Sequence, residues 1–374
     1  AGSAAAWVAG VRLGWVELVL VAAVGLTALL CGVLLTVGRA NLRVAVQLRA
    51  HRVIAGGGTD GAVTVTTPAR RRLLPVTVEL PVGEALRRFD VPVLGGGHAH
   101  RAVFTVDTER RGVIPIGPAT TVNGDPFGLL RRAVPWTGVV ELFVHPVTVP
   151  LEPLGSGLLR DLEGRTTTDI SMSDLAFHTL REYVPGDDRR HIHWRSSARA
   201  GSVGHEGKLL VRQFLDTRRA CLMVAVDGDP ASYRAAGDVE LAISAGASVA
   251  LRAIRDELDT TAVVADQVAH GMPAHLTLDR FARATPGPLP LNELVARGLR
   301  AAPAVTTAFV VTGPLPGTTD VRRALTQLPP EVNAVVLRVD GGAPAAVSAI
   351  GDLTVLTLGA LTELPPLLRP GGTR

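Results

Sequence analysis

The chain has 374 residues, of which 47% are hydrophobic and 19% are charged. This content supports two or more domains with buried cores and excludes a disordered polymer. The net charge of +4 is small for this length, and CxxC, HExxH, GxxxxGK[ST] and GxSxG motifs do not occur, so composition and motifs favour neither a strongly basic nucleic-acid-binding protein nor the common enzyme classes.

The first 40 residues are apolar with a short polar break at 11–15. Residues 16–38 contain one charge, Glu17, and about 20 apolar residues in a helix span a bilayer, so we expect a transmembrane helix here. The apolar residues before the break predict the end of another helix, and Trp7 and Trp15 stand where interfacial aromatic residues belong. The prediction is a transmembrane helix hairpin over 1–40.

Arginines on the two sides of this span predict its orientation. The connection holds Arg12 alone, whereas the residues after the span include Arg39, Arg43, Arg49 and Arg52. Because positive charge favours the inner side, we expect a multi-pass protein of the cell membrane whose large remaining part is cytoplasmic. Two isolated cysteines, Cys31 and Cys221, give no disulfide framework and agree with a reducing compartment.

Residues 41–152 contain short segments of alternating polarity, such as LPVTVEL and AVFTVDT, separated by glycine-rich and proline-containing breaks. This pattern predicts an antiparallel β-sandwich. The GGGHAHR segment at 95–101 is interpreted as a hairpin tip, because two histidines without a third ligand do not indicate a metal site. Residues 153–215 are expected to hold a polar linker and an arginine-rich motif.

In residues 216–365, near-continuous aliphatic strands alternate with helices. We expect strands at RACLMVAVD, TTAVVAD, AHLTLD, AVTTAFVVTG, EVNAVVLRVD and LTVLTLG, and helices near 234–257, 291–301 and 319–327. Such a pattern predicts a mainly parallel, doubly wound α/β sheet, in which ligands bind at the carboxyl ends of the strands.

Asp227 and Asp229 follow the first of these strands in the sequence AVDGDPAS. A von Willebrand factor A (vWA) domain begins a Mg²⁺ site at this place with Asp-x-Ser-x-Ser, but here the two serine positions hold Asp229 and Ala231. Gly313 stands where that fold offers a further aspartate. We therefore interpret Asp227 and Asp229 as a degenerate site and expect weak Mg²⁺ binding or none.

Two segments resemble the DUF58 family of bacterial membrane proteins. Residues 110–130 match its Arg-Gly-hydrophobic-Gly-Pro and Asp-Pro-Phe-Gly-Leu pattern, and residues 181–199 match a motif of approximate form R-x-Y-x-x-G-D-x-x-R-x-I-x-W-x-x-[ST]-A-R. The matching residues of the first segment are Arg111, Gly112, Gly117, Pro118, Asp125, Pro126, Phe127, Gly128 and Leu129. Those of the second are Arg181, Tyr183, Gly186, Asp187, Arg190, Ile192, Trp194, Ser197, Ala198 and Arg199.

The resemblance extends over nearly the whole chain and implies a vWA-like C-terminal domain. Members of this family are typically encoded beside MoxR-type AAA+ ATPases, often together with transglutaminase-like membrane proteins, and are implicated in assembling or maturing other proteins. The resemblance therefore implies a membrane-anchored adaptor that uses no cofactor. The partners that it implies are a MoxR-type AAA+ ATPase, a transglutaminase-like membrane protein and the lipid bilayer. The adaptor is our leading hypothesis.

The second segment has its own physical interpretation. Pro185 and Gly186 predict a tight turn in which Asp187 accepts backbone N–H groups or an arginine. If 191–195 is a strand, His191, His193 and Arg195 share an outward face, and Trp194 points inward. The motif then either fastens the linker through an Asp187 ion pair with Arg190 or Arg199, or presents its guanidinium groups to carboxylates or phosphates of a partner.

Three other functions stay open as alternatives. An enzyme would use Asp187, His191, His193 and Asp227, although no nucleophile–base pairing is recognisable among them. A metal would need His191, His193 and His205 together, without a carboxylate or thiolate at suitable spacing. A nucleic-acid-binding module would stack bases on Trp194 and Tyr183, but no nucleic acid is expected because the basic density is confined to one segment.

Overall fold

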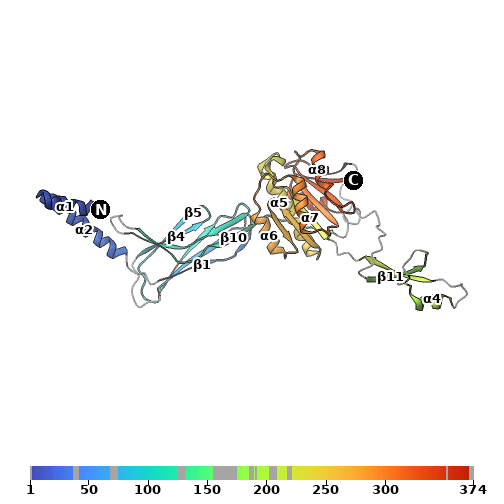
Figure 1. Cartoon of the computed structure of the whole chain (residues 1–374), viewed down its shortest axis with the longest axis horizontal. Coiled ribbons are helices and arrows are strands. Elements are labelled where there is room, and N and C mark those ends of the chain that lie inside the picture. The colour runs from blue at the N-terminus through green and yellow to red at the C-terminus, as the bar shows by residue number, and fades with distance from the viewer. Residues whose placement is uncertain are drawn as a thin grey trace. The chain divides into compact units, whose positions relative to one another are not determined.

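A computed structural model of the chain describes residues 2–36, 42–67, 75–124, 131–154, 175–184, 189, 192–201, 209–216, 221–350 and 353–369 (Figure 1). The chain divides into two compact units. Unit 1 consists of Ala1–Val147 together with Phe281–Ala284, and unit 2 consists of Thr148–Arg280 and Thr285–Arg374.

Unit 1 begins with a pair of helices, α1 (Gly2–Leu13) and α2 (Val16–Thr36). The connection turns at Gly14, whose φ of +70° is a conformation that glycine adopts without steric cost. Glycines also bring the helices together, because a Cβ at Gly10 would lie 2.8 Å from a side-chain carbon of Val19. Small residues therefore set the close packing of this helix pair.

The predicted transmembrane hairpin is wrong. In the part of the chain that the structure describes, no helix combines the length and the apolar character that crossing a membrane requires. α1 has 12 residues and is about 18 Å long, whereas the hydrocarbon core of a bilayer is about 30 Å thick.

This finding corrects every prediction that depended on the hairpin. The membrane-anchored fold class and the multi-pass placement in the cell membrane with a cytoplasmic part both required a spanning helix. Without such a helix among the described residues, the arginines after α2 carry no information about orientation.

The remainder of unit 1 is built from two sheets. A three-stranded antiparallel sheet has the order β1-β3-β6, and a seven-stranded sheet has the order β2-β10-β7-β4-β8-β9, with β5 paired to β4. Their bounds are β1 (Arg43–Leu48), β2 (Arg52–Ile54), β3 (Thr59–Thr66), β4 (Val76–Val82), β5 (Ala85–Val91), β6 (Ala99–Val106), β7 (Gly112–Ile116), β8 (Thr120–Gly124), β9 (Arg131–Pro135) and β10 (Val140–His145).

Alternation of side chains along these strands builds the core of unit 1. In β4, every second residue is buried, which places Val76, Val78, Leu80 and Val82 on one face. These residues join one hydrophobic cluster with residues of β1, β3 and β6, including Phe104. The buried faces of both sheets therefore share a core, as the alternating sequence pattern requires.

Unit 2 contains a mixed seven-stranded sheet with the order β15-β14-β13-β16-β17-β19-β18. The five inner strands are parallel, and the edge strands β15 and β18 are antiparallel to their neighbours. The bounds are β13 (Cys221–Val226), β14 (Asp259–Val264), β15 (Gln267–His270), β16 (Thr307–Thr312), β17 (Asn333–Val339), β18 (Ala346–Ile350) and β19 (Leu353–Leu358). Every residue of β13 and β16 is buried, as expected for central strands covered on both faces.

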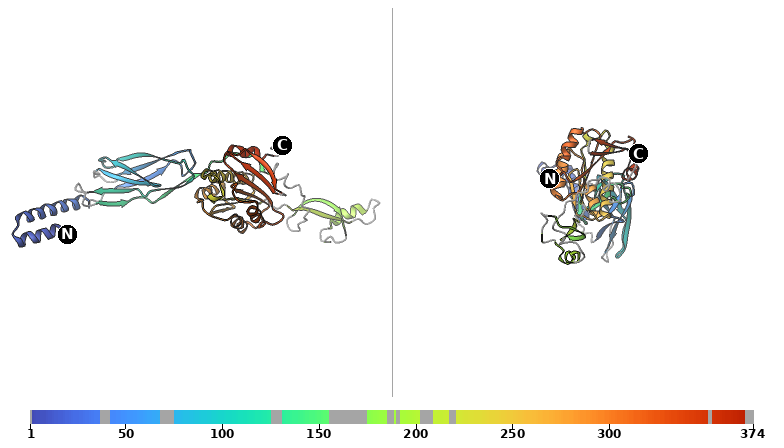
Figure 2. Two further views of the ribbon diagram at one scale, coloured as in Figure 1. Left: turned by 90° about the horizontal axis from the view of Figure 1, so that it is seen from above. Right: turned by 90° about the vertical axis from the view of Figure 1, so that its right-hand side faces the viewer.

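Helices lie beside this sheet (Figures 1 and 2). Their bounds are η3 (Pro230–Ser232), α5 (Ala236–Arg255), α6 (Ala274–Arg283), α7 (Leu291–Ala301), α8 (Thr318–Leu325), η4 (Leu361–Glu363) and α9 (Leu364–Leu367). The chain leaves β13 toward β14 on one side and later returns to β16 on the other. The order of the strands therefore reverses between β13 and β16, and this is the place where open α/β sheets bind ligands.

One predicted element of unit 2 has the wrong type. The segment AHLTLD, expected to be a strand, forms the first part of α6. Pro273 precedes it directly, and proline is favoured at helix starts because its φ is already helical and its missing N–H is not needed there. Short segments with few apolar residues do not distinguish a strand from a helix by periodicity alone.

The arginine-rich motif lies in a small separate element of unit 2. β11 (Leu175–Glu182) and β12 (Leu210–Asp216) form a two-stranded antiparallel sheet, and α4 (Trp194–Gly201) packs against it (Figure 1). An isolated bridge between Ile192 and Val211, both buried, continues the pairing toward α4.

Candidate functional site

The element formed by β11, β12 and α4 fixes the position of the arginine-rich motif. His193 precedes α4, and its backbone N–H donates to the carbonyl of Leu210 at 2.8 Å. Its ring nitrogen Nδ1 accepts from the N–H of Ser196 at 3.2 Å, so this side chain caps the start of the helix. His193 is thereby part of the scaffold.

The hydrogen bonds of Ser197 explain why the motif has a hydroxyl-bearing residue at this position. Its Oγ accepts from the Leu210 N–H at 2.8 Å and donates to the carbonyl of His193 at 3.2 Å. The residue is only 8% exposed, so both hydrogen bonds are shielded from water. A small hydroxyl side chain here therefore pins α4 to β12.

The opposite side of α4 is exposed. Trp194, Arg195, Ala198 and Arg199 cover an arc of about 140° on a helix of 3.6 residues per turn, and all four are exposed. The indole of Trp194 is 64% exposed, a large value for the most hydrophobic side chain in the motif. We call these four residues the α4 face.

The strand expected over 191–195 is wrong on this evidence. Residues from Trp194 onward are helical, which sends Trp194 outward, while the buried residue of the segment is Ile192. The exposure of Arg195 was expected. The segment had no apolar periodicity to distinguish strand from helix, and the backbone hydrogen bonds of His193 and Ser197 decide in favour of the helix.

Other residues of the same motif are less completely described. Arg181 lies at the penultimate position of β11, and its side chain is not described. The N–H of Tyr183 donates to the carbonyl of Leu209 at 2.8 Å, which continues the hairpin. Four predicted residues, Gly186, Asp187, Arg190 and His191, lie outside the described residues, as does His205.

The first motif lies in unit 1, where Arg111 has a clear role. Its Nη1 donates to the carbonyl oxygens of Phe281 at 2.6 Å, Ala282 at 3.3 Å and Ala284 at 2.7 Å. These carbonyls belong to the last turn of α6 and the residue after it, all within unit 1. The final carbonyls of a helix lack intrahelical partners and favour a cation, so Arg111 caps this helix end.

Backbone geometry explains the glycine at position 117 of that motif. Gly117 has a φ of +101°, and a Cβ there would lie 2.8 Å from the carbonyl oxygen of Gly138. Pro118 follows it, and Gly112 begins β7. Asp125, Pro126, Phe127, Gly128 and Leu129 lie outside the described residues.

Asp227 lies at the point where the strand order of unit 2 reverses, and it is only 2% exposed. Its Oδ1 accepts from the N–H of Asp229 at 2.9 Å, and its Oδ2 accepts from the hydroxyl of Thr312 at 2.8 Å. The Ser232 hydroxyl is a third donor. Burial raises the pKa of Asp227, and these hydrogen bonds partly oppose the rise.

The loop after Asp227 closes over the same sheet edge. Asp229 caps η3 by accepting from the N–H of Ala231 at 2.9 Å, and the Tyr233 hydroxyl donates to the carbonyl of Asp227 at 2.6 Å. Gly313 lies beneath this loop, because a Cβ there would stand 1.9 Å from the carbonyl oxygen of Ser232. The backbone of the loop thus occupies the space above Gly313.

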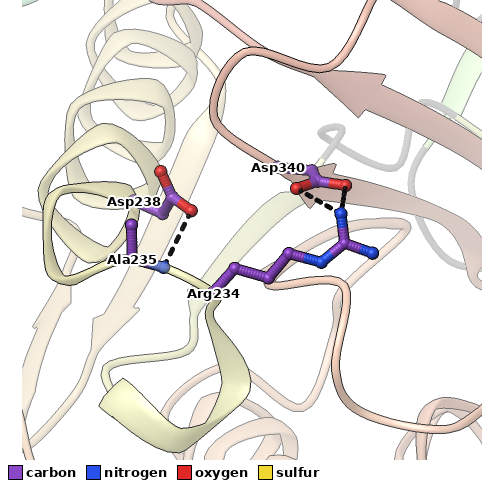
Figure 3. A network of polar contacts seen from close by, with 4 residues as sticks. All are labelled: Arg234, Ala235, Asp238 and Asp340. Atoms are coloured by element: carbon purple, nitrogen blue, oxygen red, sulfur yellow. Dashed lines mark hydrogen bonds and ion pairs between the residues drawn. The ribbon is translucent and has the colours of Figure 1, made fainter.

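An ion pair fastens the end of this loop (Figure 3). Arg234 donates through Nη1 to both carboxylate oxygens of Asp340, which follows β17, at 2.9 and 3.1 Å. Asp238 in the first turn of α5 accepts from the N–H of Ala235 at 3.3 Å. The polar groups around the loop are therefore engaged with one another.

Sequence reasoning missed Ser232 and Thr312 as partners of Asp227. Thr312 ends an apolar strand and was a visible polar position at a strand tip, whereas Ser232 lies one residue beyond the spacing of the vWA pattern. The degenerate-site interpretation of Asp227 and Asp229, with weak or no Mg²⁺ binding, stays a prediction.

The described residues do not assemble the enzyme alternative. Asp227 belongs to the sheet edge and His193 to the start of α4, and each is engaged in local hydrogen bonds. Over the described ranges, no three His, Cys, Asp or Glu side chains are grouped to hold a metal ion. A groove of about 520 Å³ lies instead along α1 and α2 and is lined by Ala4, Trp7, Val8, Ala23, Leu26 and Thr27.

Solved structures with some similarity to the chain have low scores. The CARDB domain of a Pyrococcus furiosus protein, crystallised with di-metal ions, is 16% identical, with 28% of this chain and 91% of that chain covered and a TM-score of 0.22. Cwp6 from Clostridium difficile is 10% identical, with 87% and 39% covered and a TM-score of 0.20. A β-glucosidase from Listeria innocua is 9% identical, with 29% and 16% covered and a TM-score of 0.20. TM-scores this low support no conclusion about fold or function.

A family match carries more information. No curated protein matches the chain. Residues 179–285 match the family described as "Protein of unknown function DUF58", and this range holds α4, the loop after Asp227 and the helix end that Arg111 caps. The match supports the assignment of this segment to the DUF58 family.

Proposed function

We propose that this protein is a non-enzymatic adaptor that binds an acidic surface of a partner protein through the α4 face. The observation that carries the proposal is the 64% exposure of Trp194 on a helix whose other side is pinned by Ser197. Trp and Arg are the residue types that contribute most strongly to protein–protein binding.

The chemistry of the α4 face defines the partner. Guanidinium groups form bidentate hydrogen bonds with carboxylates, and an indole contributes a large apolar area with few rotatable bonds. Because the Ser197 and His193 hydrogen bonds already order α4, binding would cost little further conformational entropy. A partner with a hydrophobic pocket surrounded by Asp and Glu fits this face.

The family resemblance supports a MoxR-type AAA+ ATPase as that partner, and a transglutaminase-like membrane protein as a further one. The family description itself assigns no activity. An adaptor role also agrees with the sheet edge at Asp227, where the described polar groups bond to one another instead of converging on a cavity.

The test is binding of the full chain to a purified MoxR-type AAA+ ATPase from the same organism at two salt concentrations. Trp194→Ala should weaken binding at least about tenfold at both concentrations, because a central aromatic contact is apolar. Arg195→Ala should weaken binding mainly at low salt and flatten the salt dependence. Arg322→Ala, an exposed arginine of α8, is the control.

Unchanged binding by both α4 variants would rule out the α4 face as the docking surface. Binding of single-stranded nucleic acid that Trp194→Ala abolishes, with no binding to the ATPase, would instead favour the nucleic-acid alternative.

A further inference from the structure

The edge strand β18 in unit 2 is unlike the other sheet edges. Within the residues that the structure describes, it pairs with β19 on one side only, with Ala346 opposite Thr357 and Ile350 opposite Leu353. Residues 346–349 are all exposed, and Val347 is 44% exposed. The sequence from Gly341 to Gly351 has no charged residue. A free edge of this kind offers a row of backbone donors and acceptors to another strand.

Every other edge strand of the described sheets that has at least five residues carries a charged residue. These residues are Arg43 in β1, Arg87, Arg88 and Asp90 in β5, Arg101 in β6, Arg131 and Arg132 in β9, Arg181 and Glu182 in β11, and Arg212 and Asp216 in β12. The remaining edges, β2 and β15, have three and four residues. Charge and short length are the usual protections of an edge, and β18 has neither.

We propose that β18 pairs antiparallel with β18 of a second copy of this chain, so that two seven-stranded sheets join into one. A second copy fits because the uncharged strand meets no like charge in its own image. Self-pairing of β5 about Arg88, by comparison, would place two guanidinium groups directly opposite each other.

The geometry fixes the register of this pairing. Directly opposite residues in an antiparallel pair point to the same face, and a two-fold axis perpendicular to the sheet preserves the faces. The residue at the axis must therefore lie opposite the same residue of the second copy, and not opposite one of its sequence neighbours. For the five residues of β18 to pair fully, that residue is Ser348, with Val347 opposite Ala349 and Ala346 opposite Ile350 of the second copy.

A charge exchange at Ser348 tests the register. Sedimentation of the full chain over a hundredfold concentration range should show self-association, and both Ser348→Lys and Ser348→Asp should abolish it because like charges then face each other. An equimolar mixture of the two variants should associate again. The control for the added charge is Thr319→Lys, because Thr319 is an exposed residue of α8. This variant should associate as the wild type does.

Oxidative crosslinking provides a second measurement that does not depend on affinity. Opposite residues in a sheet have Cα atoms about 4.5 to 5.5 Å apart, a separation that a disulfide bridges. In a Cys31→Ser background, Ser348→Cys should form a disulfide-linked dimer and Thr319→Cys should not. Cys221 is buried, and burial together with Asp259 raises its pKa to about 11, so it stays a thiol.

Several results would overturn the proposal. A wild-type chain that stays monomeric over the whole range, or a Ser348→Lys variant that associates like the wild type, would exclude self-pairing at β18. Failure of the mixed Lys and Asp variants to associate, with no Ser348→Cys crosslink, would exclude pairing of two β18 strands about Ser348.

Discussion

The sheet edge at Asp227 and the α4 face are both rich in residues that suggest function, but they differ in what their side chains do. At the sheet edge, Asp227 receives hydrogen bonds from Thr312, Ser232 and the loop backbone, and its carboxylate is 2% exposed. On the α4 face, Trp194 is 64% exposed. The comparison teaches that the place where an α/β sheet usually binds ligands is here occupied by its own loop, whereas a short helix outside the sheet leaves a large aromatic side chain exposed.

The largest effect is expected from filling the space beneath that loop. Gly313→Ala would place a Cβ 1.9 Å from the Ser232 carbonyl oxygen. To relieve this clash, the backbone at Ser232 or at position 313 would have to shift, which costs stability. We expect a loss of stability of about 3 kcal/mol or more, measured by calorimetric unfolding of the full chain.

Gly237→Ala is the matched control for this change. A Cβ at Gly237, in the first turn of α5, has no atom within 4 Å, so this variant should be neutral or stabilised by up to about 1 kcal/mol. Equal stability of the Gly313 and Gly237 variants would show that the loop does not close over the edge.

A smaller effect is expected at the pin beneath the α4 face. Ser197→Ala leaves the N–H of Leu210 without its 2.8 Å acceptor in a site that is 8% exposed. The cost should be about 1 to 3 kcal/mol for this element. Hydrogen exchange at the Leu210 amide should accelerate between about fivefold and a hundredfold, since about 1.4 kcal/mol corresponds to a factor of ten.

Ser196→Ala, one residue earlier on the same helix, keeps the Leu210 hydrogen bond and controls for the change from Ser to Ala in a helix. Should both variants leave Leu210 exchange unchanged, α4 is held by contacts other than the Ser197 hydrogen bond.

The next prediction concerns pH and the sheet edge. Burial raises the pKa of Asp227 above its unfolded value of about 3.8, despite the opposing hydrogen bonds from Ser232, Asp229 and Thr312. The folded chain therefore binds the proton more tightly, so this group favours folding at pH below about 4 and loses that contribution as pH rises through the raised pKa.

Asp227→Asn removes this titration. The free energy of unfolding of the wild type should fall relative to that of the Asn variant as pH rises from 4 through the raised pKa. Urea unfolding of both proteins over this pH range is the measurement. A constant difference between them would mean that Asp227 has an ordinary pKa and is more accessible than its burial indicates.

The smallest stability effects are expected on the α4 face. Trp194→Ala and Arg195→Ala replace exposed side chains and should change the free energy of unfolding by no more than about 0.5 kcal/mol. Thermal unfolding is the measurement, with partner binding as the contrasting readout. Strong destabilisation by Arg195→Ala with binding retained would make the motif structural and remove the difference between the two regions.

Much of the α/β sheet was readable from the sequence because its strands are continuous apolar runs. Cys221–Val226 and Thr307–Thr312 are buried at every position, and the helices expected near 234–257 and 291–301 correspond to α5 and α7. Apolar runs predict burial, but they do not decide it. The same kind of run at 16–38 led to the incorrect transmembrane helix, and several of its large side chains, such as Val16 and Leu20, are exposed.

Only the tertiary structure decided how the motif residues are used. The residue types predicted Arg111, Ser197 and Asp227 as special positions. Their hydrogen-bond partners at 281–284, Leu210 and Thr312 lie 13 to 173 residues away in the sequence. Hydrogen bonds across such distances depend on chain crossings that leave no local pattern. The sequence by itself therefore determined which segments are apolar and which residues match the family, whereas long-range backbone contacts decided that Trp194 faces outward and that the loop closes over Asp227.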